Sequence, residues 1–526
     1  MAIRRAARLQ PIRDEGRLEY WERRKQREGT MSMPEGVDEA AENGRQPEAA
    51  AWKGGVPDWV VLGLMLFMVL LTLAGPVVRA FLPVEANYNE GWNAYNAQAA
   101  LHHNLYPYRY GWKTVNYPAL SFYLVGRLSL IFGSAVRIGR VLSLISLVGV
   151  CVCVGGIVRK LTGRWGPSVF AATLSLWMFI AMATGYVAMD DPQMMAQVCI
   201  LIGFLVYLEA PASNTRIAAV AVLFVLAGNI KHNLIALPLA VFVDLLLRSR
   251  SKAARFALLG VALLVASIYL NRWLGGEFFV AQMLTPRGYS LSRVLDSSRI
   301  LLPLAVPLIL AGAWSIHQLG ASRMRRASKM RVVAIYFLLS LTLGVALYGG
   351  GGTTVNMFFD CFLAIAIILG ILLDRIWQSE IQWLQKGGAW RWAAPLLLFQ
   401  VPCADIPPVH LHPLRAAAKE YRAEVALIAA EPGPVLCESP LRCYDAGKPY
   451  EIDPFNSTSL VRLGKLDGRV LVARITRKEF GAIQTYEPVG EMSRPSERFT
   501  DEELNAIEQN YRIALQDSKC TIYLPR

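Results

Sequence analysis

The sequence of 526 residues is poor in charge and in histidine, and it lacks the short motifs of several enzyme classes. Only 18% of its residues are charged, and six are histidines. The glycine-rich run YGGGGTTVN (348–356) does not have the spacing of a phosphate-binding loop. The pair His410 and His412 is weak evidence of a metal site, and no serine-centred nucleophile motif is present. The sequence therefore indicates no metal and no other cofactor.

Long apolar runs make up much of the chain. It is 54% hydrophobic, its mean hydropathy is +0.34, and no charged residue occurs from Val60 to Val78. Runs of this length cross a bilayer. The sequence therefore predicts a polytopic α-helical membrane protein. We expect about eleven spans, at roughly 58–82, 136–158, 166–184, 193–209, 215–230, 233–248, 254–272, 299–318, 332–348, 356–375 and 391–405.

The net charge of +14 is a topology signal. Residues 58–405 hold 27 Lys and Arg against 13 Asp and Glu, whereas the two flanking regions are nearly balanced. The basic clusters are short and, with eleven spans and an N-terminus inside, all fall on the cytoplasmic side, as the positive-inside rule requires. We therefore expect no nucleic-acid partner. The same topology places the loop 83–135 and the C-terminus outside.

Composition divides the chain into three regions. Residues 1–57 are charged and poor in apolar residues, so we expect a disordered cytoplasmic segment. Residues 58–405 form the membrane region, whose first outer loop, 83–135, contains a short amphipathic stretch at 118–132 that is typical of an interfacial helix. Residues 406–526 alternate between helical and strand patterns, which predicts a small extracytoplasmic α/β domain.

Within this last region, several segments have clear patterns. Helices are expected at 414–430 and 500–511, the second with a capping box formed by Thr500 and Glu503. Strands are expected at 434–439, 469–475 and 520–525. Cys437 and Cys443 lie six positions apart; in an oxidising compartment they could form a disulfide, and two free thiols are the alternative.

The segment YNEGWNAYNA (88–97) follows the first span directly. If it is helical, Glu90 shares a face with Asn93, while Trp92 and Tyr95 lie on another. A carboxylate beside aromatic rings at a membrane surface suits proton abstraction, because partial desolvation raises its basicity. The alternative is an interfacial helix with aromatic anchors.

Two further polar groups fall on the predicted outer side. In MDDPQMMAQ (189–197), Asp191 is placed to cap the next helix, whereas Asp190 has no such local role. In GNIKHNLIALP (228–238), Lys231 contradicts the positive-inside bias, so we expect it to have an anionic partner, either an aspartate or a lipid phosphate. Further cations in or beside the outer loop 284–299 could join that site: Arg287, Arg293 and Arg299.

These motifs together resemble a family. The stretch NEGWNAYNAQAALHHNLYPY, the DDP turn and the hairpin KHNLIALPLAV are similar to those of GT-C glycosyltransferases, in particular RgtA/B/C/D-like and protein-mannosyltransferase-related enzymes. The likeness covers roughly 58–375. It implies transfer of a hexose or pentose from a polyprenyl-phosphate carrier to an envelope acceptor, at the outer face of a bacterial inner membrane. The family's loop often carries an Asp-Glu pair, whereas this chain has Asn89-Glu90.

The resemblance gives each candidate residue a role. It implies that Glu90 is the general base, with Asp191 or Asp190 orienting the acceptor or the base. The expected ligands of the donor phosphate are Lys231, His232, Arg287 and Arg293. The expected contacts to the sugar or acceptor are Asn89, Trp92, Tyr95 and Tyr117.

Two other classes of protein remain open. A transporter or lipid flippase would place ionisable groups near the bilayer midplane, often at the interface of repeats. A non-catalytic assembly protein would tolerate alanine at Glu90 and Asp191. The grouping of acids and cations on one predicted side favours the enzyme.

Overall fold

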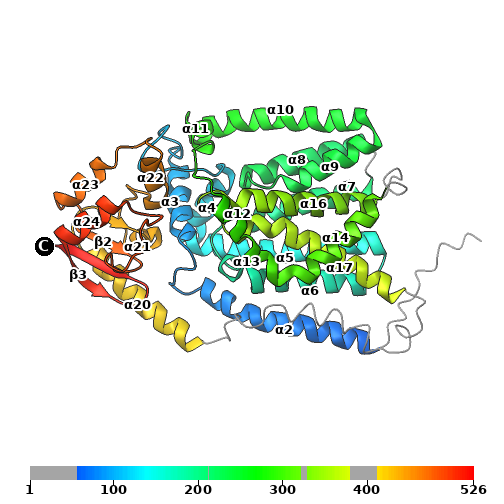
Figure 1. Ribbon diagram of the computed structural model, residues 1–526, viewed down its shortest axis with the longest axis horizontal. Coiled ribbons are helices and arrows are strands. Elements are labelled where there is room, and N and C mark those ends of the chain that lie inside the picture. Colours follow the sequence, from blue (N-terminus) through cyan, green and yellow to red (C-terminus); the bar gives the residue numbers. More distant parts are fainter. Residues whose placement is uncertain (1–55, 211–212, 321–328, 379–410) are drawn as a thin grey trace, which may run out of the picture. The chain divides into compact units, whose positions relative to one another are not determined.

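The computed structural model describes residues 56–210, 213–320, 329–378 and 411–526, and Gly54–Arg526 forms one compact unit. The described chain is mostly helical (Figure 1). Up to residue 378 the helices are α2 (Val56–Ala80), α3 (Asn89–Leu101), α4 (Leu120–Phe132), α5 (Ala135–Thr162), α6 (Trp165–Met182), α7 (Gln193–Glu209), α8 (Asn214–Ile230), α9 (Ala236–Arg248), α10 (Arg250–Gly275), α11 (Phe279–Met283), α12 (Leu291–Asp296), α13 (Ser298–Leu301), α14 (Ala305–Leu319), α16 (Lys329–Tyr348) and α17 (Phe359–Trp377).

Seven stretches of helix in the described chain are long and apolar enough to cross a membrane. The protein is therefore a multi-pass membrane protein. The spans expected at 193–209, 215–230 and 233–248 correspond to helices of 17, 17 and 13 residues, α7, α8 and α9. The span expected at 391–405 lies outside the described residues, so the total of eleven stays a prediction.

The helices differ in how much apolar surface they expose. α2 and α10, at the two edges of the helical region in Figure 1, carry large exposed apolar side chains such as Phe67 and Leu258. Such faces suit contact with lipid. α17 is mostly buried and packs against α5, α6, α14 and α16. At Gly370 a Cβ atom would lie 2.8 Å from Ala171 and 3.1 Å from Val158, so glycine allows the close approach.

Buried and half-buried ion pairs join the helices at one end of the bundle. Asp244, which is fully buried, accepts hydrogen bonds from Arg248 on its own helix and from Arg331 on α16. At the same end, Lys160 pairs with Glu209. Lys160, Arg248 and Arg331 belong to the basic clusters 159–164, 248–255 and 323–331, which the charge pattern predicts to be cytoplasmic. The loops at the opposite ends of the helices contain the polar segments described below.

The C-terminal region has helices α20 (Leu411–Ala430), α21 (Pro440–Asp445), α22 (Pro454–Arg462), α23 (Arg469–Thr476) and α24 (Asp501–Asn510), and strands β1 (Val435–Cys437), β2 (Ala482–Thr485), β3 (Tyr511–Gln516) and β4 (Thr521–Pro525). The sheet order is β1-β2-β4-β3, with β1 and β2 parallel and the other pairs antiparallel. The expected helices and the strands at 434–439 and 520–525 are confirmed, as is the capping box of Thr500 and Glu503.

The strand expected at 469–475 is wrong, because this segment is helix α23. Its β-branched residues favour a strand, but Leu471 and Ile475 are four positions apart and are both buried, so the segment packs one helical face onto α24. The local preference is overridden by that burial. Strands β2 and β3 were not expected from the sequence.

Cys437 and Cys443 are joined by a disulfide in the structure, with their Cα atoms 6.0 Å apart. The bond connects β1 to α21, which packs against α3. The position of this region outside the membrane and its independence as a domain stay predictions.

Candidate active site

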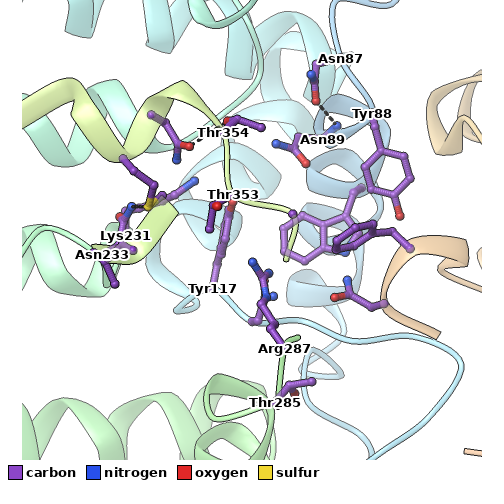
Figure 2. Close-up of a pocket in the computed structure, with 18 of the residues that line it drawn as sticks. Asn87, Tyr88, Asn89, Tyr117, Lys231, Asn233, Thr285, Arg287, Thr353 and Thr354 are labelled. Carbon is purple, nitrogen blue, oxygen red and sulfur yellow. Dashed lines mark hydrogen bonds between the residues drawn. The ribbon is translucent and has the colours of Figure 1, made fainter. Parts of the chain in front are cut away.

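A cavity of about 340 Å³ lies where the loops at one end of the helices meet. This volume falls within the range of small-molecule sites. Figure 2 shows Lys231 and Asn233 on one side of the cavity and Tyr88 and Asn89 on the other. Its walls come from the start of α3, the segments 116–117, 231–233, 283–287 and 347–357, and the C-terminal region. Every one of these membrane-region segments belongs to a loop that the sequence places outside.

Lys231 is buried in the cavity wall. Its Nζ lies 3.1 and 3.2 Å from the two carboxylate oxygens of Asp191 and 3.8 Å from the ring centroid of Tyr117. The expected anionic partner is therefore an aspartate in this structure. Asp191 also accepts a hydrogen bond from the backbone N–H of Gln193 at the start of α7, which is the expected capping contact.

His232 lines the cavity next to Lys231. Burial lowers the pKa of its imidazole to about 4, and the positive charges of Lys231 and Arg287 act in the same direction. His232 is therefore neutral at physiological pH.

Arg287 extends from the loop after α11 into the cavity (Figure 2). Its guanidinium donates one long hydrogen bond, of 3.3 Å, to the carbonyl of Gly351. No carboxylate within the described ranges pairs with it. Arg287 is thus a cation without a matching anion at the edge of a partly closed cavity, where an anionic ligand would be stabilised.

Arg293, the fourth expected phosphate ligand, does not line the cavity. It donates to the carbonyl of Thr353 at 2.8 Å and to Oε1 of Glu497 at 3.1 Å. The expected role of Arg293 toward the donor phosphate therefore has no support in its position.

Glu90 lies in a buried ion pair with Arg140. It is fully buried, and its two oxygens accept hydrogen bonds from Nε and Nη2 of Arg140 at 2.6 and 2.7 Å. The backbone N–H groups of Ala86 and Asp190 donate to it as well, at 2.8 and 3.2 Å. Glu90 does not line the cavity. Arg140 was missed, although an arginine at the outer end of a span is the same signal that singled out Lys231.

Asp190 and Asp191 also lie behind the cavity wall rather than in it. Burial raises the pKa of Asp190, and the negative charges of Glu90 and Asp191 raise it further. Asp190 packs so closely on α5 that a Cβ at Gly139 would lie 1.8 Å from its Oδ1. The three expected catalytic acids are therefore brought together, but in a buried cluster that supports the wall.

Of the four residues expected to contact the sugar or acceptor, three line the cavity. Asn89, Trp92 and Tyr117 line the cavity, with the ring centroids of Trp92 and Tyr117 5.0 Å apart. Tyr95 does not line the cavity, and its ring stacks on Tyr450 with centroids 4.7 Å apart.

The C-terminal region supplies part of the cavity wall, which no pattern in the sequence indicates. Its lining residues are Phe455, Asn456, Glu497 and Arg498. The hydroxyl of Tyr88 donates to Asp453, and the guanidinium carbon of Arg498 lies 4.2 Å from the ring centroid of Tyr88. These contacts fix the region against the first outer loop. No group of three or more His, Cys, Asp or Glu in the described chain is arranged to hold a metal ion.

The architecture is similar to that of two solved membrane enzymes. ArnT from Cupriavidus metallidurans bound to undecaprenyl phosphate gives a TM-score of 0.53 at 14% identity, covering 88% of this chain and 97% of ArnT. The oligosaccharyltransferase of Archaeoglobus fulgidus in the apo form gives 0.55 at 10% identity, covering 89% of this chain and 74% of that one. The chain has the fold of GT-C glycosyltransferases.

The GT-C fold rests on structure alone. No protein-family model and no curated protein matches the sequence. At sequence identities of 10–14%, the similarity shows a shared architecture and does not identify the substrate.

Proposed function

We propose that the protein transfers a sugar from a polyprenyl-phosphate-linked donor to an envelope acceptor at the outer face of a bacterial inner membrane. The observation that carries the proposal is Arg287, a cation without a carboxylate partner in the described chain, in a cavity walled by aromatic and amide side chains. The solved structures named above support the donor class, because ArnT was captured with undecaprenyl phosphate.

The chemistry asked of the protein is limited. A polyprenyl-phosphate sugar is a phosphodiester with one negative charge, and its phosphate gains a second as the sugar leaves. Arg287 would stabilise that developing charge, with Lys231 close by and His232 neutral. Lys231 is less available, because Asp191 already neutralises it.

The opposite side of the cavity suits a sugar. Trp92 and Tyr117 offer ring faces and edges for stacking, and the amides of Asn89 and Asn116 can hydrogen-bond to hydroxyl groups. The cavity is large enough for one monosaccharide and a phosphate, not for a long glycan. The proposal is therefore the transfer of a single hexose or pentose.

In this account Glu90 and Asp191 are positioning residues. Glu90 holds Arg140, which donates to the carbonyls of Leu82 and Val84 and so fixes the chain that leads into α3. Asp191 holds Lys231 over Tyr117. Both contacts support the wall that carries Asn89, Trp92 and Tyr117.

Mass spectrometry of envelope glycans tests the proposal. Glycans from a strain with the gene deleted should lack one monosaccharide, which the wild-type gene restores. The undecaprenyl-phosphate-linked form of that sugar should accumulate on the outer leaflet, because its consumer is gone. Unchanged glycans would contradict the proposal, and accumulation on the inner leaflet alone would favour a flippase.

A further inference from the structure

The acceptor hydroxyl must lose a proton as it attacks, and the group that takes the proton must reach into the cavity. The buried acids of the first outer loop do not meet this requirement. Glu90 accepts four hydrogen bonds behind the wall, and neither Asp190 nor Asp191 lines the cavity. At the position before Glu90, Asn89 does line the cavity, but an amide cannot serve as the base.

One carboxylate lines the cavity among the described residues, and it belongs to the C-terminal region. This is Glu497, whose side chain is 62% exposed. Its Oε1 accepts from Arg293, and that guanidinium is in turn held by the carbonyl of Thr353, which also lines the cavity. Oε2 accepts no hydrogen bond from any described residue. The carboxylate is thus oriented by one oxygen and free at the other.

We infer that Glu497 is the general base of the transfer, supplied by the C-terminal region in place of an acid in the first outer loop. The inference rests on the proposed function. The acceptor O–H gives its proton to Oε2 of Glu497, and the oxygen forms a bond to the anomeric carbon. The bond from that carbon to the phosphate oxygen breaks, and polyprenyl phosphate leaves with the electron pair. Arg293 acts as a positioning residue.

Three variants separate a base from a structural ion pair. Glu497→Gln removes the basic oxygen, Arg293→Gln removes the ion pair but keeps the carboxylate, and Glu491→Gln is a matched control on an exposed glutamate outside the cavity lining. Transfer is measured as restoration of the missing sugar in membrane vesicles of the deletion strain. Binding is measured by native mass spectrometry of each purified full-length variant with undecaprenyl phosphate.

We expect Glu497→Gln to slow transfer by about 10²–10⁴-fold while it still binds undecaprenyl phosphate. The transfer rate of Arg293→Gln should fall much less, and the transfer rate of Glu491→Gln should equal that of the wild type. Added formate should restore part of the activity of Glu497→Gly, because a small carboxylate can replace the missing base.

Two results would overturn the inference. One is transfer by Glu497→Gln at the rate of Glu491→Gln. The other is an equal loss in Glu497→Gln and Arg293→Gln with no rescue by formate, since that would make the ion pair structural. If His232→Asn lost activity while Glu497→Gln kept it, the base would be His232. Failure of the wild type itself to transfer any sugar would remove the proposed function instead.

Discussion

Glu90→Gln is expected to destabilise the folded protein by about 3–5 kcal/mol, because Arg140 would then be a buried charge without its partner. The side chains of Glu90 and Arg140 are 0% and 4% exposed, and both carboxylate oxygens of Glu90 accept hydrogen bonds from Arg140. The measurement is the unfolding midpoint of the purified protein, with Glu277→Gln on an exposed glutamate as the control.

A double-mutant cycle sharpens this expectation. The losses in the free energy of unfolding caused by Glu90→Gln and Arg140→Gln should not add, because the double variant no longer holds an unpaired charge. Recovery should be incomplete, since Arg140 also bonds the carbonyls of Leu82 and Val84. A Glu90→Gln variant that is as stable as the wild type, binds undecaprenyl phosphate and fails to transfer would instead make Glu90 the base.

Arg287→Gln is expected to lower kcat/KM for the lipid donor by about 10²–10³-fold, the usual effect of removing one group that stabilises developing charge. The fold should be unaffected, because Arg287 makes one long hydrogen bond and no ion pair within the described chain. Initial rates in proteoliposomes at varied donor concentration give the value.

The matched control is Arg299→Gln. Arg299 lies in the same loop region, its side chain is 85% exposed, and it does not line the cavity. Equal rates for Arg287→Gln and Arg299→Gln would show that Arg287 does not act on the phosphate.

Lys231→Met should lower the stability of the folded protein, because it leaves the carboxylate of Asp191 buried without its cation.

Much of the fold can be predicted from the sequence because each element has a local cause. Charge-free runs give the long helices, and the Thr500–Glu503 pair gives the start of α24. Lys231 stands out because a lysine at a predicted outer turn contradicts the positive-inside bias, and its anionic partner in the structure is Asp191. The same signal marks Arg140, a cation at a predicted outer helix end whose partner in the structure is Glu90.

The remainder depends on contacts between distant segments. Segment 469–475 has the composition of a strand, yet burial of Leu471 and Ile475 makes it helical. Glu497 and Arg498 lie in a segment that contains no recognisable functional motif. Tertiary packing brings them to the cavity of the membrane region. No spacing rule connects them to Asn89 or Arg287, so the site could be predicted on its membrane side only.

The most direct measurement of the central claim is sugar transfer by the purified protein in proteoliposomes. Synthetic undecaprenyl-phosphate-linked pentoses and hexoses serve as donors, and glycan from the deletion strain serves as the acceptor. The account predicts that one donor releases undecaprenyl phosphate and adds one sugar to the acceptor, and that Arg287→Gln slows both by about 10²–10³-fold while Arg299→Gln does not. Release of no undecaprenyl phosphate from any donor, by a folded protein supplied with that acceptor, would contradict it.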